Sequence, residues 1–192
     1  NGQDDIDAGR IRMVAEQAFV DDPLRLLRAF RMAAVLDFTI APETLQAIER
    51  HAPRIQTPAG ERLRAELIQL LACPASARLL LVMSDSGLLT RLIPEMAPMQ
   101  GCRQNSHHDF DVYTHTLKAY AALEQCLQEA GRLSAALAKR HRQPPYRRTA
   151  AAILKYALLL HDIGKPETRR VDASGEVHFY GHARQSVRMA ET

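Results

Sequence analysis

The sequence predicts an all-α fold, in which a helical region is followed by a second all-α domain. Ala, Leu and Arg are abundant, aromatic residues make up 5% of the chain and Trp is absent, a composition that favours helices over sheets. Apolar residues recur at spacings of three and four through most of the first half, as they do along the buried face of amphipathic helices. With 46% hydrophobic and 24% charged residues, the chain has the composition of a globular protein.

Charge and cysteine content narrow the function classes. A net charge of +3 is too small to indicate nucleic-acid binding by itself. The three cysteines are an odd number and widely spaced, without a C-x-x-C pair. This pattern favours a reducing, cytoplasmic compartment and argues against a cysteine zinc site. Because no apolar run approaches the roughly 20 residues that span a bilayer, we expect no membrane association. The polar start without Met leads us to expect a fragment of a longer protein.

The first half is predicted to consist of consecutive amphipathic helices. The helix over 21–36 begins with two acids and Pro23, which suit the free amides and the dipole at a helix start. Its apolar residues fall on one face and its arginines on the opposite face. Gly87 is suited to follow the end of a helix. Further helices are expected at 42–51, after 57–58, at 75–86 and at 88–93.

The periodicity stops between 94 and 107, where Pro, Gly, Asn and Ser interrupt the pattern. We therefore predict a helical region over 1–95, a linker over 96–107 and a second domain over 108–192. In the second domain we expect helices at 112–130 and 133–140, a helix ending at Leu160, a hairpin or irregular loop over 170–180, and a final helix.

The apolar helix that ends at Leu160 is followed by His161, Asp162, Ile163, Gly164 and Lys165. Histidine supplies a neutral nitrogen and aspartate a hard oxygen, a mixture that Mg, Mn, Fe and Zn accept. Gly164 is predicted to close the helix in a left-handed conformation. Lys165 would then place a cation suited to phosphate at the mouth of the site.

Two further histidines extend this candidate metal site. His115 lies in the first turns of a predicted helix, and His182 lies at the head of the last one. We predict His115, His161, Asp162 and His182 as ligands, because histidine is the usual neutral ligand and a neighbouring carboxylate fixes its tautomer. The alternative, that each histidine is an ordinary core or surface residue, is strongest for His182.

The order of His115 followed by His161 and Asp162 resembles the HD superfamily of metal-dependent phosphohydrolases, which are all-α domains. The resemblance implies hydrolysis of a phosphomonoester or 2′,3′-cyclic phosphate with a divalent metal (Mg, Mn or a transition metal) that activates water. His161 and Asp162 would be catalytic, and Lys165 would assist electrostatically. The superfamily pattern ends with a distal aspartate on a later helix. No aspartate follows Asp172, so we expect the domain to be truncated at its C-terminus.

Asp22 and Arg25 form a second candidate site. Their spacing of three residues makes them neighbours on one helical face. On spacing alone, an ion pair on a solvated face is the favoured interpretation. The other interpretation is that an acceptor beside a planar donor fork matches the hydrogen-bonding edge of a base.

Residues 21–31 read DDPLRLLRAFR, which resembles the neck motif of the class II tRNA nucleotidyltransferase and bacterial poly(A) polymerase family. Similar segments of that family lie at 2–12 and 61–67, and those of an appended HD domain at 111–115, 161–168 and 179–182. The resemblance implies that Asp22 and Arg25 recognise the base of CTP or ATP. We assign Arg28 to the same nucleotide site and Arg31 to RNA binding.

The implied parent protein binds the 3′ end of tRNA or RNA and extends it with CTP or ATP, using Mg²⁺. The family's catalytic head, with its Asp-x-Asp metal motif, should precede Asn1, so we do not expect this sequence alone to transfer nucleotides. The motif is shared by CCA-adding and poly(A)-adding enzymes and does not separate them. The motif also gives no indication of the oligomeric state.

A basic stretch over 132–148 contains six Lys or Arg residues and no acid. Most such stretches are solvated loops, but Arg147 and Arg148 are candidates for contact with RNA phosphates.

Three hypotheses follow for the function as a whole. The first is the neck and RNA-binding helices of a nucleotidyltransferase joined to an active HD domain. The second is an RNA-binding helical module with a vestigial HD site. The third, a stand-alone HD hydrolase, leaves residues 21–31 unexplained.

Overall fold

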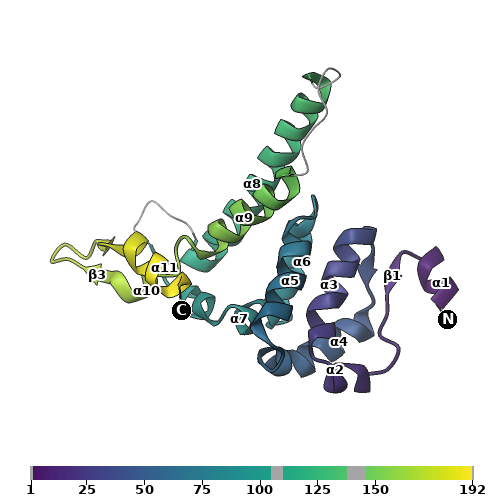
Figure 1. Cartoon of the computed structure of the whole chain (residues 1–192). Helices are drawn as coiled ribbons and strands as arrows, with labels where there is room; N and C mark the ends of the chain where they lie inside the picture. Colours follow the sequence, from purple (N-terminus) through teal and green to yellow (C-terminus); the bar gives the residue numbers. More distant parts are fainter. Residues whose placement is uncertain (1, 105–109, 138–145, 192) are drawn as a thin grey trace.

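The computed structural model describes residues 2–104, 110–137 and 146–191. It confirms the predicted all-α class, because helices make up most of the described chain and its strands are only two or three residues long. Figure 1 shows a helical body from which a pair of long helices projects, with the C-terminal helices and hairpin beside the base of that pair.

The body contains the first ten elements of the chain with one further 3-10 helix at its end. Strands β1 and β2 pair in parallel and fasten the N-terminal segment beside α3. The elements are α1 (Gly2–Asp7), β1 (Arg10–Ile11), α2 (Gln17–Asp21), α3 (Leu24–Leu36), β2 (Thr39–Ile40), α4 (Pro42–His51), η1 (Ala52–Gln56), α5 (Gly60–Leu71), α6 (Ser76–Asp85), α7 (Leu88–Leu92) and η2 (Pro94–Met99).

Helix α3 is the centre of this body. Its inward face buries Leu27, Phe30 and Ala33 completely, as the apolar spacing predicts. The helix ends at Asp37, which adopts a left-handed conformation with φ of 55°. Arg78 of α6 closes this end, because its guanidinium lies 2.8 Å from Asp37 Oδ1 and donates to the carbonyl of Phe38.

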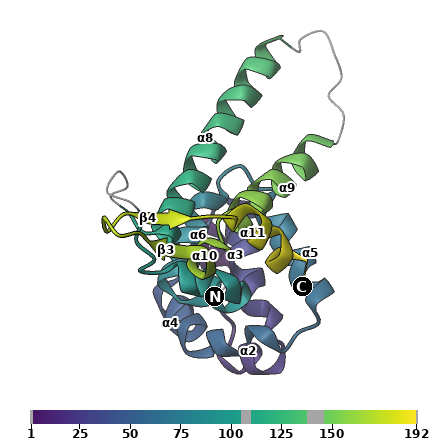
Figure 2. The same cartoon turned by 90° about the vertical axis from the view of Figure 1, so that its left-hand side faces the viewer.

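The remaining elements are α8 (Val112–Leu137), α9 (Tyr146–Leu160), α10 (Lys165–Thr168), β3 (Arg169–Val171), β4 (Val177–Phe179) and α11 (His182–Ala190). Figures 1 and 2 show α8 and α9 side by side along the projecting pair. The prediction of separate helices at 112–130 and 133–140 was wrong, since α8 runs unbroken to Leu137. Gly131 disfavours a helix by only about 1 kcal/mol relative to Ala, which is too little to end one that is packed.

Of the two alternatives left open for 170–180, the structure has the hairpin. Strands β3 and β4 pair antiparallel, with Arg170 opposite His178. Asp172 builds the turn, because its Oδ1 accepts hydrogen bonds from the backbone amides of Ser174 and Glu176. An aspartate at the start of a turn that contains Gly175 is the expected chemistry.

The buried apolar residues form one cluster that reaches from Phe19 in α2 to Ile163 after α9. Met96 and Met99 of η2 are completely buried in it, so the described core includes residues at the start of the predicted linker over 96–107. The division at 95 and 108 stays a prediction. Within the described ranges, no helix is long and apolar enough to cross a membrane.

Candidate metal centre and nucleotide-binding helix

The start of α8 places His115. Asp111 precedes the helix and accepts a hydrogen bond from the backbone amide of Thr114 at 2.8 Å, the usual role of an N-cap aspartate. Its other oxygen accepts from the backbone amide of Gly101 at 2.7 Å. Burial opposes ionisation of Asp111, but the bonds from Thr114 and Gly101 outweigh it and lower its pKa. His115 is therefore held in the first turn of α8.

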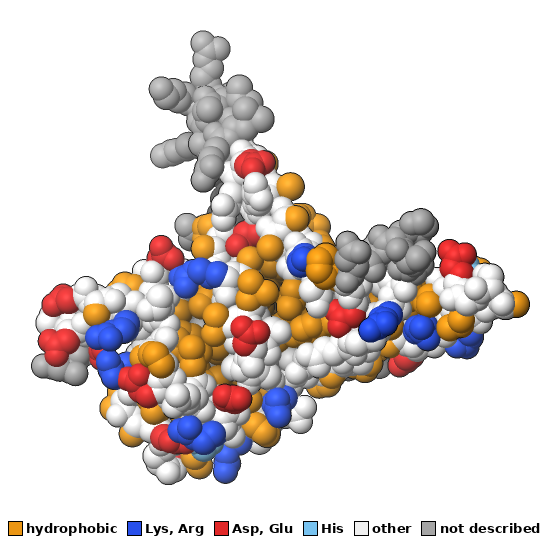
Figure 3. Space-filling view, turned by 180° about the vertical axis from the view of Figure 1, so that it is seen from behind, with side chains coloured by type: hydrophobic (Ala, Val, Ile, Leu, Met, Phe, Trp, Pro, Cys, Tyr) orange, Lys and Arg blue, Asp and Glu red, His pale blue; other side chains and the backbone are white. Residues whose placement is uncertain are grey.

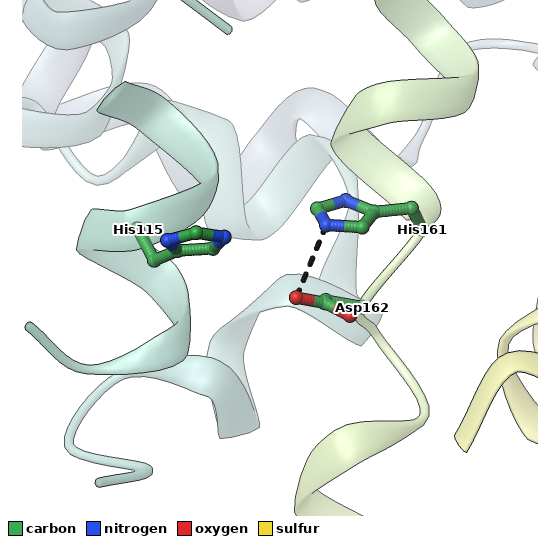
Figure 4. Close-up of side chains that lie close together, drawn as sticks. All are labelled: His115, His161 and Asp162. Atoms are coloured by element: carbon green, nitrogen blue, oxygen red, sulfur yellow. Dashed lines mark ion pairs between the residues drawn. The ribbon is translucent and has the colours of Figure 1, made fainter. Parts of the chain in front are cut away.

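The end of α9 places His161 and Asp162, which follow Leu160 directly. The Nδ1 atom of His161 lies 2.6 Å from the carbonyl oxygen of Leu158. Since a carbonyl only accepts, Nδ1 carries a proton and Nε2 is the ring nitrogen that faces the site. Figure 4 shows His115 on α8 facing His161 and Asp162 at the end of α9.

These three residues form a compact ligand set. One ligand atom from each of His115, His161 and Asp162 lies within 4.8 Å of the others. The rings of His115 and His161 are 6.3 Å apart between centroids. Two imidazoles and one carboxylate at this spacing are a donor set that suits a divalent transition metal or Mn²⁺.

Asp162 is the buried member, with a side chain only 3% exposed. Its Oδ2 atom lies 3.1 Å from His161 Nε2 and 2.8 Å from Lys165 Nζ. Burial alone would raise the pKa of Asp162, but these two partners outweigh it and lower the pKa to about 2. The same carboxylate raises the pKa of His161.

The geometry around Oδ2 of Asp162 fits a cation. Although Oδ2 lies at ion-pair distance from His161 and Lys165, no described residue gives this buried oxygen a well-aligned hydrogen bond. A buried carboxylate oxygen in that state retains a lone pair for a positive ligand.

His182 lies at the edge of this group. It is the first residue of α11 and follows Gly181, whose φ is 77°. Its Nε2 lies 3.7 Å from Asp162 Oδ1, while Nδ1 lies 2.8 Å from the carbonyl of Phe179. The structure thus places the three predicted histidine ligands and Lys165 around the fourth predicted ligand, Asp162. His182 lies outside the tighter set of His115, His161 and Asp162.

The prediction for the conformation of Gly164 was wrong, since its φ is −81°. Glycine is required here for space instead. A Cβ atom at this position would lie 2.6 Å from the carbonyl oxygen of His182 and 2.6 Å from the amide nitrogen of Ser186. The Gly164 amide donates to Ser186 Oγ at 3.0 Å. The missing side chain lets α11 approach the turn that carries His161 and Asp162.

A second group of potential ligands lies on the hairpin, where Asp172, Glu176 and His178 come within 4.8 Å of one another. His178 Nε2 lies 2.8 Å from Asp172 Oδ2. Asp172 and His178 already bond within the hairpin, and Asp172 and Glu176 are exposed, so we assign no site to them.

Around α3, the structure separates the residues predicted to bind nucleotide. Asp22 lies 3.2 Å from Arg62 of α5, a partner that the sequence analysis did not identify. Arg25 is exposed and makes no ion pair with any residue that the structure describes. Arg28 and Arg31 both contact the buried carboxylate of Glu66 on α5, with 3.0 Å between Arg28 Nε and Glu66 Oε1. Arg28 and Arg31 therefore join α3 to α5.

Arg147 and Arg148 belong to the first turn of α9, but their side chains lie outside the described part of the structure. The face in Figure 3 shows hydrophobic side chains gathered at its middle, while Lys and Arg are spread along its margins with Asp and Glu among them. No single basic stripe marks an RNA path on that face.

Comparison with known proteins identifies the family. A family model described as "Probable RNA and SrmB- binding site of polymerase A" matches residues 37–100. The A-adding tRNA nucleotidyltransferase of Deinococcus radiodurans is 38% identical over 189 residues, which cover 95% of this chain and 39% of that protein. The CC-adding tRNA nucleotidyltransferase of Thermus thermophilus is 36% identical over 183 residues, covering 92% of this chain and 38% of that protein.

The "Multifunctional CCA protein" of Azoarcus sp. is 33% identical and covers 95% of this chain and 39% of that protein. The chain thus spans about two fifths of the length of these relatives. Among solved structures, a "tRNA-processing enzyme (apo form 2)" has a TM-score of 0.59 at 18% identity and covers 84% of this chain and 40% of that one. At that identity the likeness shows a shared fold. These relatives are 33–38% identical to this chain and match 92–95% of it, and the family model matches part of its first half. The chain therefore belongs to the class II tRNA nucleotidyltransferase family.

Proposed function

We propose that this chain supplies the part of a tRNA nucleotidyltransferase that holds the 3′ end of tRNA and presents Asp22 and Arg25 to the base of CTP or ATP. The observation that carries this proposal is the exposed guanidinium of Arg25 on the first turn of α3. Asp22 lies just before that turn and is held by Arg62 with its side chain 26% exposed. A fixed acceptor beside an accessible donor fork is suited to reading a base edge.

Binding of CTP and of tRNA to the chain, measured by calorimetry and by fluorescence anisotropy at low salt, tests this function. Arg25→Ala is expected to weaken CTP binding about tenfold, the loss of a hydrogen bond to a charged donor. Arg188→Ala, on the exposed side of α11, is the matched control and should leave it unchanged. Equal CTP affinity of the Arg25 and Arg188 variants would refute the assignment of Arg25.

We further propose that residues 108–192 form a metal-dependent phosphohydrolase site of the HD kind, acting on a phosphomonoester or a 2′,3′-cyclic phosphate. The carrying observation is the convergence of His115, His161 and buried Asp162 from two helices. A divalent ion held there would supply a Lewis acid and lower the pKa of a water molecule. Asp162 is kept ionised by its neighbours, His161 is oriented by the carbonyl of Leu158, and Lys165 offers a cation for the phosphoryl oxygens.

Electron paramagnetic resonance titration with Mn²⁺ and an assay of 2′,3′-cyclic AMP hydrolysis test this second function. His161→Ala and Asp162→Asn should each abolish the tight Mn²⁺ site and the hydrolysis. His178→Ala removes a histidine from the hairpin and serves as the matched control. Binding of Mn²⁺ without hydrolysis would favour the alternative of an RNA-binding module with a vestigial site.

The free cysteines lead us to place the protein in the cytoplasm.

A further inference from the structure

Gln104 contacts the candidate metal centre through Lys165. It lies in the segment that follows η2, next to Arg103, which forms a bridge with Asp111 at the start of α8. Gln104 is only 8% exposed, and its Oε1 accepts a hydrogen bond from Lys165 Nζ at 2.8 Å, across 61 residues of sequence. This amide therefore joins the segment before α8 to the start of α10, after α9.

The orientation of the Gln104 amide follows from its partner. An ammonium only donates, so the oxygen of the amide must face Lys165. The Nε2 atom is then buried, and no described residue accepts a hydrogen bond from it. A buried amide with an unsatisfied nitrogen destabilises a fold relative to an apolar side chain of similar size. Packing alone thus does not explain a glutamine at this position.

The position of the Lys165 ammonium gives a reason. Its Nζ lies 2.8 Å from Asp162 Oδ2 as well as from Gln104 Oε1, and its side chain is 13% exposed. An ammonium has three N–H donors, and Gln104 Oε1 accepts from one of them, while Asp162 Oδ2 is an ion-pair partner without a well-aligned hydrogen bond. A lysine side chain has four flexible methylenes, so the hydrogen bond to Gln104 and the charge of Asp162 together hold its end in place, with donors left for a ligand.

We infer that Gln104 is a positioning residue that holds Lys165 Nζ beside Asp162, so that the ammonium receives the anionic oxygen of a phosphoester. This inference rests on the proposed hydrolase function. It assigns Gln104 no contact with substrate, because the free atom of its amide is fully buried. It also predicts that loss of the amide impairs anion binding while the metal ligands remain intact.

The test compares two affinities in the same variants: that for Mn²⁺, and that of the Mn²⁺-loaded chain for inorganic phosphate. Gln104→Leu is expected to keep the Mn²⁺ affinity within about twofold and to weaken phosphate binding about tenfold, as the loss of a hydrogen bond to a charged group does. Its urea unfolding midpoint should be unchanged or higher, because the unsatisfied nitrogen is gone. Gln104→Glu keeps an acceptor oxygen and should retain phosphate affinity.

Gln100→Leu, an exposed glutamine four residues earlier, is the matched control and should change neither affinity. Lys165→Met should weaken phosphate binding, and adding Gln104→Leu to it should weaken binding no further, because both residues act through one ammonium. Unchanged phosphate affinity in Gln104→Leu, or a parallel loss of Mn²⁺ affinity and stability, would overturn the inference and leave the hydrolase proposal standing. A wild-type chain that binds no Mn²⁺ would overturn both.

Discussion

Lys155 Nζ lies 2.5 Å from Glu124 Oε2, and both side chains are almost completely buried. The same ammonium donates to Ser76 Oγ and to the carbonyl of Cys73, each at 2.9 Å. Glu124 in turn accepts from the backbone amides of Ser76 and Ala77 at the start of α6. One ion pair between α8 and α9 therefore also caps α6, and connects the projecting pair of helices to the helical body.

Loss of one partner of this pair should be severe. Glu124→Gln leaves the Lys155 charge uncompensated in the core, which is expected to lower the free energy of unfolding by about 3–5 kcal/mol. Glu129→Gln, an exposed change on the same helix, should stay within about 0.5 kcal/mol of wild type. Urea unfolding followed by circular dichroism measures both. Similar stabilities of the two variants would show that the ion pair contributes little.

Gly164→Ala should strain the turn that carries the metal ligands. Because the φ of Gly164 is ordinary, the effect is one of space: the new Cβ would meet backbone atoms of His182 and Ser186. We expect a loss of about 1–3 kcal/mol, measured by thermal unfolding. Gly60→Ala at the start of α5, where a Cβ would meet nothing within 4 Å, should be neutral or stabilising by up to about 1 kcal/mol. The opposite order of stabilities would contradict the close approach of α11.

Glu66→Gln is expected to loosen the contact between α3 and α5. Its carboxylate is the shared partner of Arg28 and Arg31, and weakening charge-assisted hydrogen bonds to a buried group lowers the unfolding free energy by about 1–3 kcal/mol. Glu61→Gln on the exposed face of α5 is the control. If Glu66→Gln were as stable as Glu61→Gln, Arg28 would be available to ligands rather than committed to α5.

Acid should weaken the contact between the α2 N-terminus and the α4 C-terminus. Hydrogen bonds from Arg50 and His51 lower the pKa of Glu16 from 4.5 to about 2. A group with a lowered folded-state pKa stabilises the fold above its unfolded pKa and loses that contribution as the pH falls toward the folded value. The stability difference between wild type and Glu16→Gln should therefore shrink from pH 5 to pH 2 in urea unfolding. A difference that stays constant over this range would show that the ionised Glu16 contributes nothing.

Local patterns were enough to predict most of the helices and to select residues that the structure brings together, His115, His161 and Asp162, whose role as metal ligands stays a prediction. The apolar spacing along α3 predicts its buried face, and His161 with Asp162 directly follows the apolar run that ends α9. The aspartate and glycine of the hairpin specify a tight turn, because both residue types favour one locally. These predictions depend on neighbours within a few residues along the chain.

Contacts between residues far apart in the sequence could not be predicted from local patterns. Asp22 meets Arg62 forty residues away, and Arg28 contacts Glu66 thirty-eight residues away, while the assignment of Asp22 and Arg28 to a nucleotide site stays a prediction. Lys155 interrupts an apolar stretch, which signals a buried partner, but nothing local identifies Glu124 as that partner. Gly164 was recognised as special for the wrong reason, because its constraint comes from α11 rather than from its own backbone.

The cap that Glu124 places on α6 is supplied from 48 residues further along the chain. During synthesis, α6 is made before Glu124, whose carboxylate accepts hydrogen bonds from the first amides of that helix. The start of α6 therefore stays incompletely capped until α8 and Lys155 of α9 have been made. We therefore expect the folding rate of this protein to be limited by the slow closure of long chain loops rather than by the rapid formation of its separate helices.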